Sequence, residues 1–161
     1  MIPRTSAQST SRVLLAGLIG NVMEWYDFAV YGYFATVIGR EFFPSSDPAA
    51  SLIGAFGAFA AGFLVRPLGG VVFGRIGDLA GRQVALKLSV MVMAVPTVLM
   101  GLLPTHSQIG IAAPIAVVLL RIVQGLSVGG EYTSSIIFLS ENAPERQRGF
   151  YAIWGLWGSV L

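Results

Sequence analysis

Five ionisable side chains lie inside stretches of sequence that are otherwise apolar enough to cross a membrane. They are Glu24, Asp27, Arg66, Arg121 and Glu131. A charge inside a bilayer is costly, so such residues usually face a bundle interior or a watery cavity and pair with one another. A buried carboxylic acid can take up a proton and release it again when an arginine approaches. Arginine can also bind the carboxylate of a solute through its two-pronged guanidinium.

Their spacing predicts which of these side chains meet. Glu24 and Asp27 are three residues apart, so they share one helix face and point at the same cavity. Counted from the cytoplasmic ends of their helices, Arg66, Glu131 and Glu24 lie roughly 10, 13 and 16 Å deep at 1.5 Å per residue. Arg66 is therefore expected to pair with Glu131 or Glu24, or alternatively to extend to the cytoplasmic headgroups. Arg121 lies nearer the outer leaflet.

The composition indicates an all-α integral membrane protein. Of the 161 residues, 55% are hydrophobic and 11% are charged, whereas soluble domains carry about 25% charged residues. The charges form neither a like-charged run nor a basic stripe with interleaved aromatics, which excludes a nucleic-acid partner. No metal-ligand cluster, cofactor motif or nucleophile with an adjacent base is evident, and cysteine is absent.

Apolar stretches predict four membrane-spanning helices and part of a fifth. The predicted spans cover residues 13–38, 49–73, 84–103 and 109–139, followed by residues 150–161. Twelve residues of helix reach only about 18 Å, so the sequence is expected to end inside a membrane helix, as a fragment would. Lysine and arginine mark the cytoplasmic side, which predicts a cytoplasmic N-terminus. The inside set is Arg4, Arg12, Arg75, Arg82, Lys87, Arg146 and Arg148, and the outside set is Arg40.

The stretch 74–83 is predicted to connect the second and third spans. Gly74 and Gly81 permit a tight turn, and Asp78 is placed to cap the next helix, with Arg82 reaching back to it. Small residues in the second and fourth spans favour close helix packing. These include Gly54, Gly57, Gly62, Gly125, Gly129 and Gly130. Aromatic residues near the outer end of the first span suit an interfacial belt, namely Tyr31, Tyr33, Phe42 and Phe43.

Several motifs together resemble the major facilitator superfamily. GRIGDLAGR at 74–82 resembles its loop signature between helices two and three, and RIVQGLSVGGE at 121–131 resembles its helix-four motif. More narrowly, GNVMEWYDFAVYG, FLVRPLGGVVFGRIGD, RIVQGLSVGGEY and SENAPERQRGFY look like the metabolite:H⁺ symporter family. That family carries α-ketoglutarate, citrate, shikimate, and proline or betaine. Leu79 and Gln83 replace basic residues that are usual in the loop, which reduces its charge.

The resemblance implies proton-coupled symport of a small organic metabolite by alternating access. It implies that residues 1–161 form part of the N-terminal six-helix half, in a bacterial inner membrane, and require the remaining helices or a partner chain. The implied roles are proton coupling by Glu24, Asp27 and Glu131, and substrate binding or ion pairing by Arg66, Arg121, Gln124 and Tyr26. Gly74, Asp78, Gly81 and Arg82 would form the gating loop.

Two other function classes remain open from the sequence. A small membrane subunit or scaffold that acts only with a partner chain is suggested by the length of the sequence. An intramembrane enzyme could use Glu24 and Asp27 as an acid–base pair, but no nucleophile, metal ligand or cofactor motif accompanies these carboxylates.

Overall fold

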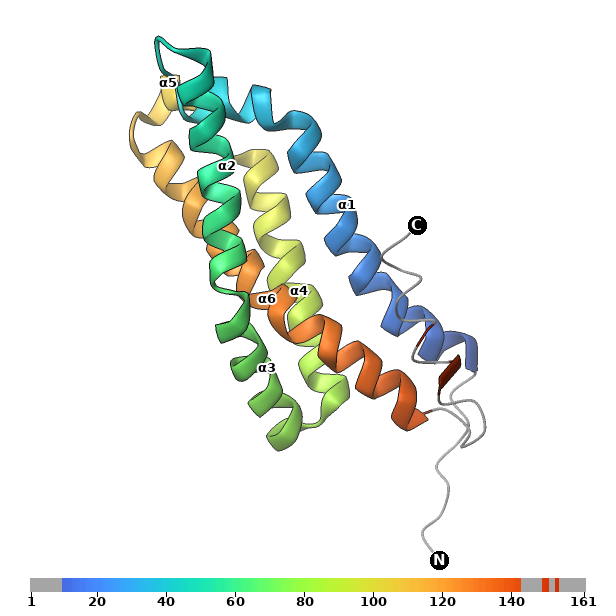
Figure 1. Ribbon diagram of the computed structural model, residues 1–161. Coiled ribbons are helices and arrows are strands. Elements are labelled where there is room, and N and C mark those ends of the chain that lie inside the picture. Colours follow the sequence, from blue (N-terminus) through green and yellow to red (C-terminus); the bar gives the residue numbers. More distant parts are fainter. Residues whose placement is uncertain (1–9, 143–148, 151–152, 154–161) are drawn as a thin grey trace, which may run out of the picture.

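The computed structural model describes residues 10–142, 149–150 and 153, with side chains placed for 22–129, 149–150 and 153 (Figure 1). The described chain is helical and contains no strand. The helices are α1 (Thr10–Phe42), α2 (Pro48–Leu64), α3 (Arg66–Ala80), α4 (Arg82–Leu102), α5 (His106–Ile109) and α6 (Ala112–Asn142). The predicted fifth span, 150–161, lies almost entirely outside the described residues.

The helices run up and down as antiparallel neighbours joined by short connections. The α1–α2 connection and α5 lie at one end of the bundle, and the α3–α4 turn lies at the other (Figure 1). Asp47 begins α2 by accepting a hydrogen bond from the Ala49 N–H at 2.9 Å, and Pro48 occupies the first helical position. The α3–α4 turn depends on Gly81, whose φ of +96° is readily adopted only by glycine.

Within the described residues, three helical stretches are long and apolar enough to cross a membrane. They are Pro48–Ala80, Arg82–Leu102 and Ala112–Gly129. In addition, the 33 residues of α1 extend about 50 Å, which exceeds a hydrocarbon core of about 30 Å. The fold is therefore an all-α membrane bundle.

The second predicted span differs from expectation in two ways. It breaks at Val65 into α2 and α3, because Pro67 has no N–H for the Phe63 carbonyl and disfavours helical backbone at the preceding residue. α3 then continues to Ala80, so the expected loop 74–83 is helical except at Gly81. The prediction that Gly74 lies in a turn was wrong.

Helix α6 packs against α1, α2, α3 and α4, and glycines allow its closest approaches. A Cβ on Gly62 would lie 2.7 Å from the Arg121 carbonyl oxygen, and one on Gly69 would overlap the Leu126 carbonyl. Likewise a Cβ on Gly125 would overlap the backbone of Gly62, and one on Gly129 that of Arg66. The predicted packing role therefore holds for Gly62, Gly125 and Gly129, whereas Gly57 faces open space.

Two side-chain hydrogen bonds tie the helices together inside the bundle. Tyr31 of α1 donates its hydroxyl to the Ala55 carbonyl of α2 at 2.7 Å, and Ser127 of α6 donates to the Ser89 carbonyl of α4. Tyr31 is buried, so its predicted place in an interfacial aromatic belt was wrong. Tyr33, two residues later, is exposed and suits such a belt.

Candidate functional site

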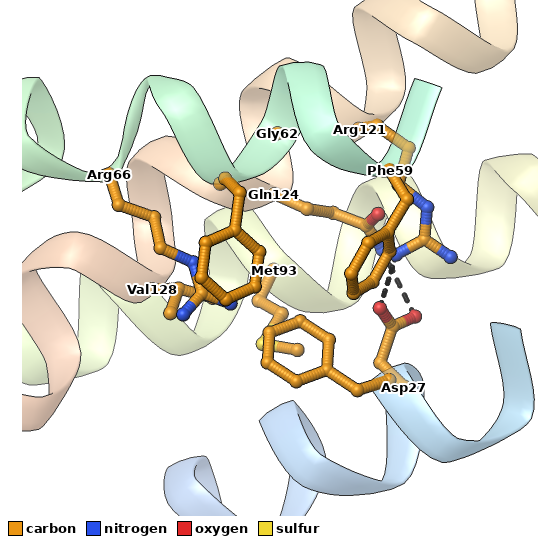
Figure 2. A pocket seen from close by; sticks show the side chains of 11 residues that line it. Asp27, Phe59, Gly62, Arg66, Met93, Arg121, Gln124 and Val128 are labelled. Atoms are coloured by element: carbon orange, nitrogen blue, oxygen red, sulfur yellow. Dashed lines mark hydrogen bonds and ion pairs between the residues drawn. The ribbon is translucent and has the colours of Figure 1, made fainter. Parts of the chain in front are cut away.

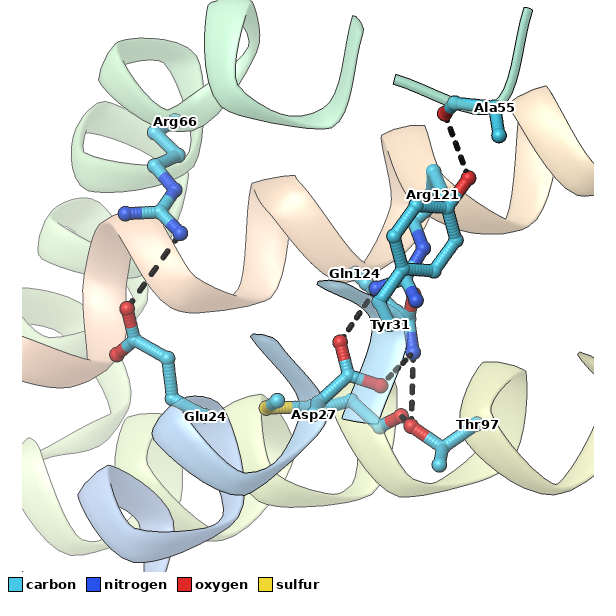
Figure 3. A network of polar contacts seen from close by, with 9 residues as sticks. Glu24, Asp27, Tyr31, Ala55, Arg66, Thr97, Arg121 and Gln124 are labelled. Atoms are coloured by element: carbon cyan, nitrogen blue, oxygen red, sulfur yellow. Dashed lines mark hydrogen bonds and ion pairs between the residues drawn. The ribbon is translucent and has the colours of Figure 1, made fainter. Parts of the chain in front are cut away.

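A buried ion pair joins α1 to α6. Arg121 donates from Nη1 to Asp27 Oδ2, and the two residues are only 5% and 8% exposed (Figure 3). The pair lies at the middle of the polar network, where few water molecules can compete for either charge. Each charge is therefore compensated chiefly by the other, and separating them would leave an uncompensated ion inside the bundle.

Gln124 extends this ion pair toward α4. It follows Arg121 by three residues, so both side chains leave the same face of α6. Its Nε2 donates to Thr97 Oγ1 at 2.7 Å and, more weakly, to Asp27 Oδ1 at 3.4 Å (Figure 3). Thr97 in turn donates its hydroxyl to the Met93 carbonyl at 2.9 Å. Asp27 therefore receives hydrogen bonds from two side chains of α6.

Aromatic rings cover the Arg121 guanidinium. Its Cζ lies 3.8 Å from the centroid of the Tyr31 ring and 5.9 Å from that of Phe59. Tyr31 and Phe59 stack on each other at 5.5 Å, and the hydroxyl of Tyr31 is held by Ala55. A cation over an aromatic face is stabilised by the ring quadrupole. These rings hold Arg121 in place without supplying it with a second anion.

A second ion pair lies between α1 and the start of α3. Arg66 Nη2 lies 3.5 Å from Glu24 Oε1, and the arginine is half-buried while the glutamate is buried (Figure 3). The Arg66 guanidinium also lies over the rings of Phe63 at 3.6 Å and Phe28 at 4.6 Å. Of the two predicted partners, the structure brings Glu24 to Arg66. Glu131 belongs to α6, but its side chain is outside the described residues.

A small cavity lies between the two ion pairs. Its volume is about 10 Å³, room for one water molecule. The lining combines the polar groups of Asp27, Arg66, Arg121 and Gln124 with Phe28, Phe59, Phe63, Met93 and Val128 (Figure 2). Three buried polar atoms of this lining have no hydrogen-bond partner among the described residues: Arg66 Nε, Arg121 Nε and Gln124 Oε1. The cavity is thus small, and its lining carries two unused donors and one unused acceptor.

The sequence is similar to those of known membrane carriers. The family model described as "Sugar (and other) transporter" matches residues 13–160. The chain belongs to this family of the major facilitator superfamily. It is a family of carriers, not of enzymes.

The curated relatives of this chain are much longer than the chain itself. A glycine betaine/proline/ectoine/pipecolic acid transporter, OusA of Dickeya dadantii, is 46% identical over 149 residues, which are 92% of this chain and 30% of that protein. The proline/betaine transporter of Escherichia coli K12 is 44% identical over the same shares. The shikimate transporter of Escherichia coli K12 is 45% identical over 91% of this chain and 34% of that protein. The chain spans about a third of their length. No solved structure shows significant similarity.

The residues predicted to form a gating loop lie at the end of the bundle opposite α5 (Figure 1). Arg82 Nη2 donates to Asp78 Oδ1 at 2.6 Å across the Gly81 turn. Asp78, however, sits in the last turn of α3 and does not cap α4, whose first N–H groups receive no side-chain hydrogen bond. The capping prediction was wrong because α3 continues six residues beyond Gly74 and carries Asp78 with it.

One predicted site residue lies away from the cavity, and two residues that were not predicted as site residues contact the polar side chains of the site. Tyr26 is 71% exposed and does not line the cavity, because it precedes Asp27 and so points to another side of α1. Tyr31 and Thr97 both belong to the polar network. Tyr31 follows Asp27 by four residues, a spacing that could have indicated their shared helix face. Thr97, in the apolar span α4, has no comparable indication.

Proposed function

We propose that the chain is part of a secondary transporter that couples the movement of a small organic acid or zwitterion to protons by alternating access. The observation that carries the proposal is the buried Asp27–Arg121 pair, whose side chains line a small cavity. Membership of the transporter family and relatives named for proline, betaine and shikimate support a small solute with a carboxylate.

The pair offers a physical route to symport. A substrate carboxylate and Asp27 would compete for the same Arg121 guanidinium, which can hold a carboxylate through two hydrogen bonds. Once the substrate occupies Arg121, Asp27 loses its compensating charge in a buried site and takes up a proton. Substrate and proton therefore bind together and leave together, and this positive coupling is reciprocal.

The other predicted residues take supporting roles in this scheme. Glu24 is a second proton-coupling candidate, held by Arg66, and Glu131 is a third. Gly74, Asp78, Gly81 and Arg82 would form a latch that closes one side of the transporter. We place the protein in the bacterial inner membrane with a cytoplasmic N-terminus, completed by further helices or by a partner chain.

Uptake by a completed transporter tests the proposal. The whole chain would replace the matching segment of the Escherichia coli proline/betaine transporter, and vesicles would receive an acid-outside pH gradient. We expect labelled L-proline to accumulate against its concentration gradient and a protonophore to abolish that accumulation. Accumulation that survives the protonophore, or equilibration without accumulation, would contradict proton coupling.

A further inference from the structure

We propose that Gln124 is a specificity-determining residue of this transport site, whose amide oxygen accepts a hydrogen bond from an N–H or O–H of the substrate. The inference rests on the proposed function and extends it. It names the substrate class as a carboxylate that carries a hydrogen-bond donor close by.

The hydrogen bonds around Gln124 fix which end of its amide faces its neighbours. Thr97 uses its only proton to bond the Met93 carbonyl, so toward Gln124 it can only accept. The ionised Asp27 carboxylate likewise can only accept. Both neighbours therefore require the NH₂ end of the amide, and the two N–H groups are fully used.

The amide oxygen is consequently left facing the cavity. Gln124 is 3% exposed, it lines the cavity, and its Oε1 has no donor among the described residues. A buried acceptor without a donor is unfavourable, so such an atom indicates a missing partner. The cavity has room for about one water molecule, so a substrate requires it to widen.

Arg121 supplies the complementary donor on the same helix face. Its Nε is buried and unpartnered within the described part of the chain, one turn away from Gln124 Oε1. An acceptor and a cationic donor on one face of α6 suit a molecule with a carboxylate and a neighbouring N–H or O–H. L-proline has both groups. Glycine betaine has the carboxylate and the positive charge but no N–H, so it is the matched control solute.

The test compares these two solutes in the completed transporter described above. The Gln124→Met variant keeps the side-chain length and removes the acceptor. We expect it to raise the KM for L-proline about tenfold relative to the KM for glycine betaine, as loss of one hydrogen bond to a charged group would.

Thr97→Val is the control for general damage to the network. It removes the other partner of the Gln124 amide but leaves Oε1 in place, so both KM values should change together. An equal change for both solutes in Gln124→Met, or no change, would overturn the inference. So would a selective loss of L-proline in Thr97→Val.

Binding separates this inference from the proposed function. Displacement of labelled L-proline by each unlabelled solute, in the same membranes, measures affinity without transport. Binding of both solutes without accumulation would count against the proposed function alone. The effect of Gln124→Met would then be measured as the change in the ratio of the L-proline and glycine betaine affinities. Failure of the wild type to bind either solute would overturn the inference.

Discussion

Asp27 and Arg121 are 94 residues apart in the sequence and form a buried ion pair between α1 and α6. The Asp27 carboxylate also accepts a hydrogen bond from Gln124, and the Arg121 guanidinium lies against the Tyr31 ring. Three side chains from two helices, Arg121, Gln124 and Tyr31, thus hold the Asp27 carboxylate in place beside one cavity. The second pair, Glu24 and Arg66, lies on the other side of that cavity with its own aromatic cover.

Exchanging the charges of Glu24 and Arg66 tests the second pair. Glu24→Arg or Arg66→Glu alone places two like charges together in a mostly buried site. Breaking a buried ion pair costs about 3–5 kcal/mol, so we expect uptake to fall at least about tenfold. The double variant Glu24→Arg/Arg66→Glu should recover most of the uptake. Recovery by the Arg66→Glu/Glu131→Arg exchange instead would show that the pairing is wrong.

Glycine substitutions test the contact between α3 and α6. Gly69→Ala places a Cβ on the Leu126 carbonyl, so the helices must separate, at a cost of about 1–3 kcal/mol. Gly57→Ala meets nothing within 4 Å and should be neutral or stabilising by up to about 1 kcal/mol, because alanine favours helix. Thermal unfolding of the purified chain in detergent measures both. Equal effects of the two substitutions on the melting temperature would contradict a close backbone contact between α3 and α6 at Gly69.

Substitutions at Gly77 and Gly74 test the proposed latch that contains the Asp78–Arg82 pair. A Cβ on Gly77 would lie 2.8 Å from Arg82 Nη1, so Gly77→Leu should push Arg82 away from Asp78. Gly74→Leu meets no atom within 4 Å of its Cβ and is the matched control. We expect Gly77→Leu to lower uptake severalfold while changing stability by less than about 1 kcal/mol, because this exposed pair contributes little to folding. Undiminished uptake in Gly77→Leu would argue against a latch.

The helices could be predicted from the sequence because apolar content and length determine which segments cross a bilayer. The shared direction of Glu24 and Asp27 followed from their three-residue spacing. The partner of Arg121 was not predicted, and two partners remained open for Arg66, because the pairing depends on where α6 crosses α1, α2 and α3. Those crossings are set by backbone contacts at glycines such as Gly69 and Gly125, which a spacing rule does not locate.

The errors in the prediction have equally local causes. Gly74 and Gly81 suggested a loop over residues 74–83, but inside a membrane the backbone keeps its hydrogen bonds by remaining helical up to Gly81. Pro67, which does break the helix, lies within an apolar run that suggested continuity. Tyr31 was expected at the membrane surface because tyrosine is common there, yet its hydroxyl finds an acceptor at Ala55.

Orientation in the membrane can be measured with single cysteines, because the chain contains none of its own. Ala80→Cys lies at the α3–α4 turn and Ser107→Cys lies in α5, at opposite ends of the bundle (Figure 1). With a cytoplasmic N-terminus, an impermeant maleimide added to intact cells should label the Ser107→Cys variant only. Labelling of the Ala80→Cys variant alone would reverse the proposed orientation.

Accumulation and exchange of L-proline by the Asp27→Asn variant test most directly whether the Asp27–Arg121 pair couples substrate to protons. Asparagine resembles the protonated acid in shape and charge, so the substrate should still exchange across the membrane while no proton can be carried. In the completed transporter, we expect proton-driven accumulation of L-proline to be lost while exchange of labelled for unlabelled L-proline persists. Accumulation at the wild-type level in Asp27→Asn would contradict it.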